Sequence, residues 1–121
     1  MQLDAETNRP TPSAPASGAF VVESGGDRLG APMYVVGDDV WVKISSRDTG
    51  GAFAVMEART KPLEGPPLHL HHKQDEWWYI LEGEFLFEVD GQQIHAGPGA
   101  TVYAPRGSQH TFQNISNAPG R

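Results

Sequence analysis

Glycine and proline interrupt this sequence so often that long helices are excluded. The chain of 121 residues contains 14 Gly and 10 Pro, and no stretch longer than about ten residues shows an uninterrupted helical period of apolar residues. Short segments rich in Val, Ile, Phe, Tyr and Trp remain between the turns. This pattern predicts an all-β fold, which could be a sandwich, a jelly roll or a small barrel.

Short segments with the composition of β-strands follow one another along most of the chain. They cover residues 20–24, 33–37, 39–46, 51–59, 67–72, 76–83, 84–91, 92–96, 101–105 and 110–114. The dipeptide Asp90-Gly91 lies between two of them and predicts a type I′ hairpin. The length suits one domain, which we expect at residues 20–121. Residues 1–19 are rich in Pro, Ala, Ser and Thr and predict a flexible arm, or an arm that packs on a partner subunit.

The composition excludes several classes of protein. Nine Lys and Arg stand against fifteen Asp and Glu, and the net charge is −6, so we expect neither a nucleic-acid partner nor an anionic membrane. The sequence has no cysteine, which excludes disulfides and thiolate ligands. The first residues lack the features of a signal peptide, and no apolar run approaches the ~20 residues of a membrane span. We therefore expect a cytoplasmic protein.

Four potential metal ligands lie close together in the stretch GPPLHLHHKQDEWWYILEG, residues 65–83. Side chains alternate along a strand, so His69 and His71 point the same way and His72 points to the opposite face. Their Cα atoms would be roughly 6.5 Å apart, which allows both imidazoles to reach one ion.

A carboxylate on the next strand can complete three ligands. Glu76 shares a face with Trp78 and Ile80, and it meets the two histidines if the chain folds back beside them. Asp75 is the rival, but using it requires a one-residue slip that would turn the apolar partners outward. A fourth ligand should come from another strand, where His95 and His110 remain. His95 is expected to face solvent, and a Pro-x-Gly turn precedes His110.

At this point the sequence resembles the cupin family. The first cupin motif is matched by His69-x-His71, four residues, Glu76, six residues and Gly83. The second is matched at every spacing; its members here are Gly99, Pro105, Gly107, His110 and Asn114. Together the motifs cover about residues 65–114. One departure is that the first motif usually opens with a Gly separated from the first His by five residues, where this chain has Leu63, and Gly65 lies closer.

The resemblance implies a double-stranded β-helix, that is, a jelly-roll barrel. It also implies one divalent transition metal (Fe, Mn, Ni, Co, Cu or Zn) held by His69, His71, Glu76 and His110. The assignment of His110 comes from the resemblance.

Aromatic residues surround these positions. Most should form the core, and we assign Trp78 and Phe112 to a substrate pocket. Trp77, Tyr79 and Leu81 share the other face, which is too apolar for water; it is either covered by other parts of the chain or lies in a subunit interface. Since cupins are often dimers, we expect a homodimer.

The run HHKQDEWWYILEGEF resembles the quercetin-dioxygenase-type cupins. It suggests a metal-dependent, dioxygenase-like oxidoreductase that acts on a small oxygenated or aromatic compound. Glu76 would be the catalytic residue, because it could ligate the metal and also accept a proton from a substrate hydroxyl. The alternatives are a small-molecule binding or sensing module without catalysis, and a metal-assisted isomerase or cyclase.

In the cupins that this chain resembles, another apolar strand follows the second motif. None follows Asn114 here, where the sequence is ISNAPGR. We therefore expect a C-terminal truncation, or a neighbouring subunit that supplies the strand. Either case predicts an unpaired edge on the strand at 110–114.

Overall fold

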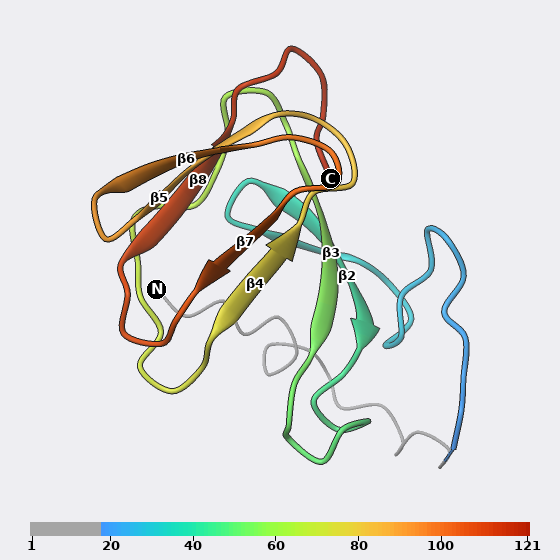
Figure 1. The fold of residues 1–121 in the computed structure, drawn as a ribbon. Helices are drawn as coiled ribbons and strands as arrows, with labels where there is room; N and C mark the ends of the chain where they lie inside the picture. Colours follow the sequence, from blue (N-terminus) through green and yellow to red (C-terminus); the bar gives the residue numbers. More distant parts are fainter. Residues whose placement is uncertain (1–17) are drawn as a thin grey trace. The chain divides into compact units, whose positions relative to one another are not determined.

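The structure, a computed structural model, describes residues 18–121, so residues 1–17 of the expected arm lie outside the described residues. Every regular element in the described part is a β-strand, which confirms the all-β prediction (Figure 1). The strands are β1 (Met33–Val35), β2 (Asp38–Ile44), β3 (Val55–Thr60), β4 (Glu76–Tyr79), β5 (Phe85–Val89), β6 (Gln92–Ala96), β7 (Thr101–Ala104) and β8 (His110–Asn114). The search of residues 18–121 for a helix able to span a membrane finds none.

The described chain divides into two compact units. The larger comprises residues 36–38 and 59–121, with β4 to β8, and the smaller comprises residues 18–35 and 39–58, with β1 and most of β2 and β3. In the larger unit β4 pairs with β7, and a second sheet has the order β6-β5-β8. Both sheets are antiparallel, and their paired strands lie side by side (Figure 1).

Alternation along these strands builds the core of the larger unit. Phe85 and Phe87 on β5 are buried, as are Ile80 after β4 and Val102 on β7, while intervening residues face outward. Trp78 and Phe112 pack against this cluster while remaining partly exposed. The rings of Phe87 and Phe112, which are paired across β5 and β8, have centroids 5.4 Å apart. The apolar period of two therefore decides which face carries the core.

The hairpin between β5 and β6 has the predicted geometry. Asp90 and Gly91 both have positive φ, 48° and 81°, which confirms the type I′ turn. Asp90 also contacts the segment before β8: its backbone N–H donates to the carbonyl of Gln109 at 2.8 Å, and its Oδ1 accepts from the Gln109 N–H at 2.8 Å.

The expectation of an unpaired edge on β8 is wrong. One side of β8 pairs with β5, and the segment 63–69 lies along the other. His69 and His110 exchange two backbone hydrogen bonds of 3.1 and 2.8 Å. At the other end of β8, the Asn114 N–H donates to the Glu64 carbonyl, and the Asn114 carbonyl accepts from Leu63. The edge is occupied because the chain around the first histidine runs back beside it. The strand expected at 67–72 is absent, and this segment forms only the isolated bridge at His69.

Gly65 allows this close approach. A Cβ on Gly65 would lie 1.8 Å from the carbonyl oxygen of Phe112, so a side chain there would push β8 away. Leu63, at the position where the motif usually has Gly, has a φ of 63°. This is the left-handed region that non-glycine residues rarely adopt.

Two further contacts secure the last residues of the described chain within the larger unit. Gly120 pairs with Thr60 through two backbone bonds of 2.9 Å, and Arg121 bonds through its backbone to Leu81 and Glu82. The fully buried Asn114 side chain donates to the carbonyls of Thr60 and Ala118. The second motif's asparagine therefore has a structural role.

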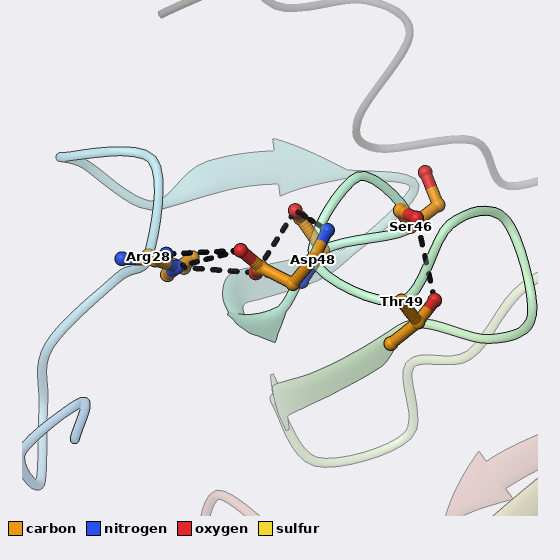
Figure 2. A network of polar contacts seen from close by, with 5 residues as sticks. Arg28, Ser46, Asp48 and Thr49 are labelled. Carbon is orange, nitrogen blue, oxygen red and sulfur yellow. Dashed lines mark hydrogen bonds and ion pairs between the residues drawn. The ribbon is translucent and has the colours of Figure 1, made fainter. Parts of the chain in front are cut away.

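The smaller unit contains most of the sheet β1-β2-β3 and a polar network around Asp48. Figure 2 shows the side chains of Arg28 and Asp48 facing each other. Nη2 of Arg28 lies 2.9 Å from Oδ1 of Asp48. Oδ2 of Asp48 also accepts from the N–H and the hydroxyl of Ser45, at 2.9 and 3.0 Å. This network ties the turn after β2 to the chain before β1. The expected strand at 20–24 is absent, and Phe20 and Val21 are exposed.

Candidate metal centre

The first two histidines lie on the segment beside β8. His69 and His71 are 5% and 3% exposed, whereas His72, which directly follows them in the sequence, is exposed. The bridge from His69 to His110 fixes one end of this segment, and the Gly107 N–H donates to the His71 carbonyl at 2.7 Å near the other. The alternation that predicted a shared face for His69 and His71 is confirmed.

Glu76 is the first residue of β4 and shares its half-buried face with Trp78. The outward face carries Trp77 and Tyr79, which are 57% and 50% exposed. Asp75, the rival carboxylate, takes no part in the cluster; it forms an ion pair with Arg106, with Nε of Arg106 3.1 Å from its Oδ1. The register inferred from the apolar residues is therefore the one that the structure has.

The fourth residue of the cluster is His110, the first residue of β8, which is 2% exposed. His95 lies on β6 with its side chain 60% exposed, 3.7 Å from a carboxylate oxygen of Glu84. This confirms that His95 faces solvent.

The four side chains converge on one point. One potential ligand atom from each of His69, His71, Glu76 and His110 lies within 4.8 Å of the others. Oε2 of Glu76 lies 2.8 Å from Nε2 of His110 and 2.9 Å from Nε2 of His71. Three imidazoles and a carboxylate within a space of this size are a donor set that suits a single transition-metal ion.

Backbone carbonyls orient two of the imidazoles. Nδ1 of His69 lies 2.7 Å from the carbonyl oxygen of Pro67, and Nδ1 of His110 lies 3.1 Å from that of Ser108. A proton on each Nδ1 leaves Nε2 as the free lone pair of a neutral ring, which is the form that binds metals.

Burying these imidazoles costs free energy unless their ring nitrogens have a hydrogen-bond partner or a metal ion. Burial is the main cause that lowers the pKa of His69, and the neighbouring His110 lowers it further, against the opposing effect of the Pro67 carbonyl. Nε2 of His69 and both ring nitrogens of His71 are buried without a hydrogen-bond partner among the described residues. Buried polar atoms normally have partners, so these atoms fit a metal ion as the missing one.

Aromatic and charged residues surround the cluster. The ring of Trp78 meets that of His110 edge to face, with centroids 5.3 Å apart, and also contacts Phe87 and Phe112. Phe112, which packs against the core cluster, lies two residues after His110 on β8.

Sequence reasoning considered Asp75 only as a rival ligand and missed its contact with Arg106. Hydrogen bonds from the side chain and backbone of Arg106 hold the pKa of Asp75 at about 2. The available signal was a pair of opposite charges, Asp75 directly before Glu76 and Arg106 in the Pro-x-Gly turn before His110, but the separation of 31 residues along the sequence hides the contact.

Comparison with known proteins gives a consistent result. The family model described as "Cupin domain" matches residues 56–121, more than half of the chain. Mannose-1-phosphate guanylyltransferase of Escherichia coli (strain K12) is 30% identical over 79 residues, which are 65% of this chain and 16% of that protein. Quercetin 2,3-dioxygenase of Bacillus subtilis (strain 168) is 30% identical over 96 residues, which are 78% of this chain and 27% of that protein. The chain thus spans less than a third of the length of either relative.

The fold is also that of solved structures. The crystal structure of a predicted oxalate decarboxylase from Thermotoga maritima superposes with a TM-score of 0.75 at 21% identity, covering 84% of this chain and 92% of that one. At this identity the likeness concerns the fold alone. Together with the two motifs, the convergent histidines and the family match, it leads to one conclusion: this chain belongs to the cupin domain family.

Proposed function

We propose that this chain is a metal-dependent, dioxygenase-like oxidoreductase that acts on a small oxygenated or aromatic compound. The observation that carries the proposal is the convergence of His69, His71, Glu76 and His110 within 4.8 Å, with buried ring nitrogens that lack hydrogen-bond partners. The similarity to a quercetin 2,3-dioxygenase over 78% of the chain supports the reaction class.

The four residues of the cluster would have the role of metal ligands. His69, His71, His110 and Glu76 would hold one divalent transition metal, Fe, Mn, Ni, Co, Cu or Zn. When bound, this ion would supply a Lewis acid with open positions for a substrate oxygen or for dioxygen. Four protein ligands leave such positions open on a five- or six-coordinate ion, which distinguishes a catalytic centre from a structural one.

Glu76 would be the catalytic residue of this chain. Its Oε2 contacts two imidazoles, and its side chain is 24% exposed, in contrast to the buried histidines. A carboxylate with this access can accept the proton of a substrate hydroxyl at Oε1 or Oε2. Trp78, which packs edge to face against His110, and Phe112 would form the apolar wall of the substrate pocket.

The test is metal analysis followed by oxygen consumption. Purified protein would be analysed for bound metals by mass spectrometry, reloaded with each of the six candidates, and assayed with an oxygen electrode on flavonols and enediols. We expect uptake that depends on the metal and is lost in Glu76→Gln. Metal binding with ligand binding but no oxygen uptake would favour a sensing module, and turnover without oxygen would favour an isomerase or cyclase.

We also propose that the outward face of β4 forms a homodimer interface. Trp77, Tyr79 and Leu81 on this face are 57%, 50% and 49% exposed, and the facing Tyr103 on β7 is 56% exposed. Adjacent exposed aromatic residues on one sheet are typical of a surface that meets another protein.

A further inference from the structure

Two separate segments carry the four residues of the candidate metal centre. One segment, residues 69–76, brings His69, His71 and Glu76, and the other, residues 105–110, brings His110. The relative position of the two segments decides whether the ligand atoms converge. Contacts that connect them are therefore candidates for positioning the site.

One carboxylate connects the segments through several bonds at once. Oδ1 of Asp75, the residue before Glu76, accepts from the backbone N–H of Arg106 at 2.9 Å and from its Nε at 3.1 Å. Oδ2 of Asp75 accepts from Nη2 of Arg106 at 3.3 Å. Two backbone hydrogen bonds also connect the segments. The Gly107 N–H donates to the carbonyl oxygen of His71 at 2.7 Å, and the His110 N–H donates to the carbonyl oxygen of His69 at 2.8 Å.

We propose that Asp75 and Arg106 form a clamp that positions His110 against His71 and Glu76 for metal binding. The inference rests on the proposed function, because it assigns the clamp to the same metal centre. Both residues are positioning residues: neither supplies an atom to the cluster of potential ligands.

The geometry of the clamp suits orientation more than global stability. The side chains of Arg106 and Asp75 are 61% and 39% exposed, and exposed ion pairs contribute little to the stability of a whole domain. However, a carboxylate that bonds both a guanidinium and the backbone of the same residue fixes direction as well as distance. Because Asp75 is adjacent to Glu76 in the chain, a shift at Asp75 is transmitted to a potential ligand.

The chain offers a matched control. Arg121 and Glu82 form an ion pair of the same type, with Nε of Arg121 3.0 Å from Oε2 of Glu82 and side chains 41% and 61% exposed. Neither residue lies in the segments 69–76 and 105–110. Glu82→Ala therefore removes an exposed ion pair without touching the contact between the ligand segments.

The experiment compares wild type, Asp75→Ala, Arg106→Ala and Glu82→Ala by two measurements. The first is hydrogen exchange of the Gly107 and His110 amides in metal-free protein, resolved by NMR. The second is Co(II) affinity by competition with a chelator, together with the visible absorption of the Co(II) form. We expect faster exchange at both amides and about 10-fold weaker Co(II) binding in Asp75→Ala. Arg106→Ala, which keeps the backbone bond, should have a smaller effect, and Glu82→Ala should match wild type.

Each outcome decides a separate question. Unchanged exchange at Gly107 and His110 in Asp75→Ala would overturn the clamp, whatever happens to the metal. Faster exchange with wild-type Co(II) affinity and spectrum would also overturn it, since the contact would then hold the segment without positioning the ligands. Faster exchange in a protein whose wild type binds no Co(II) would leave the connection between the segments supported and would refute the proposed metal-dependent function and the metal-positioning role.

Discussion

Leu63 occupies a backbone conformation that glycine tolerates better. Its φ is 63° and its side chain is 71% exposed, so no apolar burial compensates for the strain. Hydrogen bonds to β8 hold Leu63 in this conformation. The Leu63 N–H donates to the carbonyl oxygen of Asn114, and the Leu63 carbonyl accepts from Nε2 of Gln113 at 3.1 Å. This chain therefore differs from the first motif in the residue type at position 63, while the backbone there keeps a conformation that suits glycine.

This strain predicts opposite effects for two substitutions. A left-handed non-glycine residue costs about 1–2 kcal/mol, and glycine loses about 0.5–1 kcal/mol through its greater freedom in the unfolded chain. Leu63→Gly should therefore be neutral or raise the free energy of unfolding by up to about 1.5 kcal/mol. Leu63→Ile should lower it by about 1 kcal/mol or more, because β-branching disfavours positive φ.

Urea denaturation would measure both changes. Leu68→Ile is the control, since Leu68 is also exposed, at 52%, and is not among the residues of positive φ. A loss of stability in Leu63→Gly as large as in Leu63→Ile would show that the side chain, and not the backbone, determines this position.

The individual histidines also differ in what their removal should do. His110→Ala or Glu76→Ala removes a member of the convergent cluster, and each should lower bound metal sharply, by about 10-fold or more in affinity. His72→Ala and His95→Ala remove exposed imidazoles and should leave metal content near wild type. Mass spectrometry of the purified variants measures this directly. Loss of metal in His72→Ala together with retention in His71→Ala would contradict the facing of this segment.

At the scale of elements, alternation and turn chemistry predicted the strands that pair locally. The expected strand at 92–96 coincides with β6, because a period of two and a type I′ turn specify its hairpin with β5 from nearby residues alone. The same reasoning failed at 20–24. This segment has a strand-like composition, yet strand formation depends on a partner for the backbone, and the structure gives it no strand pairing.

In the candidate site, too, contacts between residues close in sequence were predictable, and contacts between distant segments were not. His69, His71 and Glu76 follow from alternation within a few residues. The placement of His110 beside them required the resemblance, because nothing local says which strand faces which. The contact of Asp75 with Arg106 and the pairing of 63–69 with β8 are set by tertiary proximity, and no pattern in the sequence specified them.

The network around Asp48 makes a prediction about pH for the turn after β2. The hydrogen bond from Arg28 is the main cause that holds the pKa of Asp48 at about 2, with further lowering by Ser45. An acid with a lowered folded-state pKa stabilises the fold above its ordinary pKa, and this contribution is lost as the pH falls through the folded-state value. Stability should therefore decline as the pH falls from about 4 to about 2.

Urea denaturation at several pH values in this window, followed by circular dichroism, tests the assignment. Asp48→Asn and Arg28→Gln should each be less stable than wild type at neutral pH and should lose less stability on acidification. The dependence should weaken without vanishing, because Asp75 also has a pKa of about 2. An acid dependence identical to wild type in both variants would show that the network does not contribute in this window.

At the scale of the molecule, the outward face of β4 and β7 is the feature that fits the proposed dimer. A two-fold symmetric interface uses the same face on both copies, and Trp77 and Tyr103 are directly paired across the two strands. Aromatic side chains of this kind dominate the energetics of many interfaces.

Sedimentation measurements over a range of concentrations test the interface. Wild type should dimerise, and Trp77→Ser should shift the equilibrium toward monomer, by about 10-fold or more in dissociation constant if Trp77 is a dominant contact. Leu68→Ser, which changes an exposed apolar residue elsewhere, should leave it unchanged. A wild type that remains monomeric at the highest concentrations would refute the interface.

The approach of Gly65 to the carbonyl oxygen of Phe112 bears on how a mutational scan of this protein would be interpreted. Every substitution at Gly65 adds a Cβ, and all of them should displace the strand that begins with His110. A saturation library selected for metal retention would therefore rank Gly65 with the ligands, although it has no side chain to offer an ion. Selecting the same library for folding alone would separate the two classes, because intolerance at Gly65 should persist there while intolerance at Glu76 should relax.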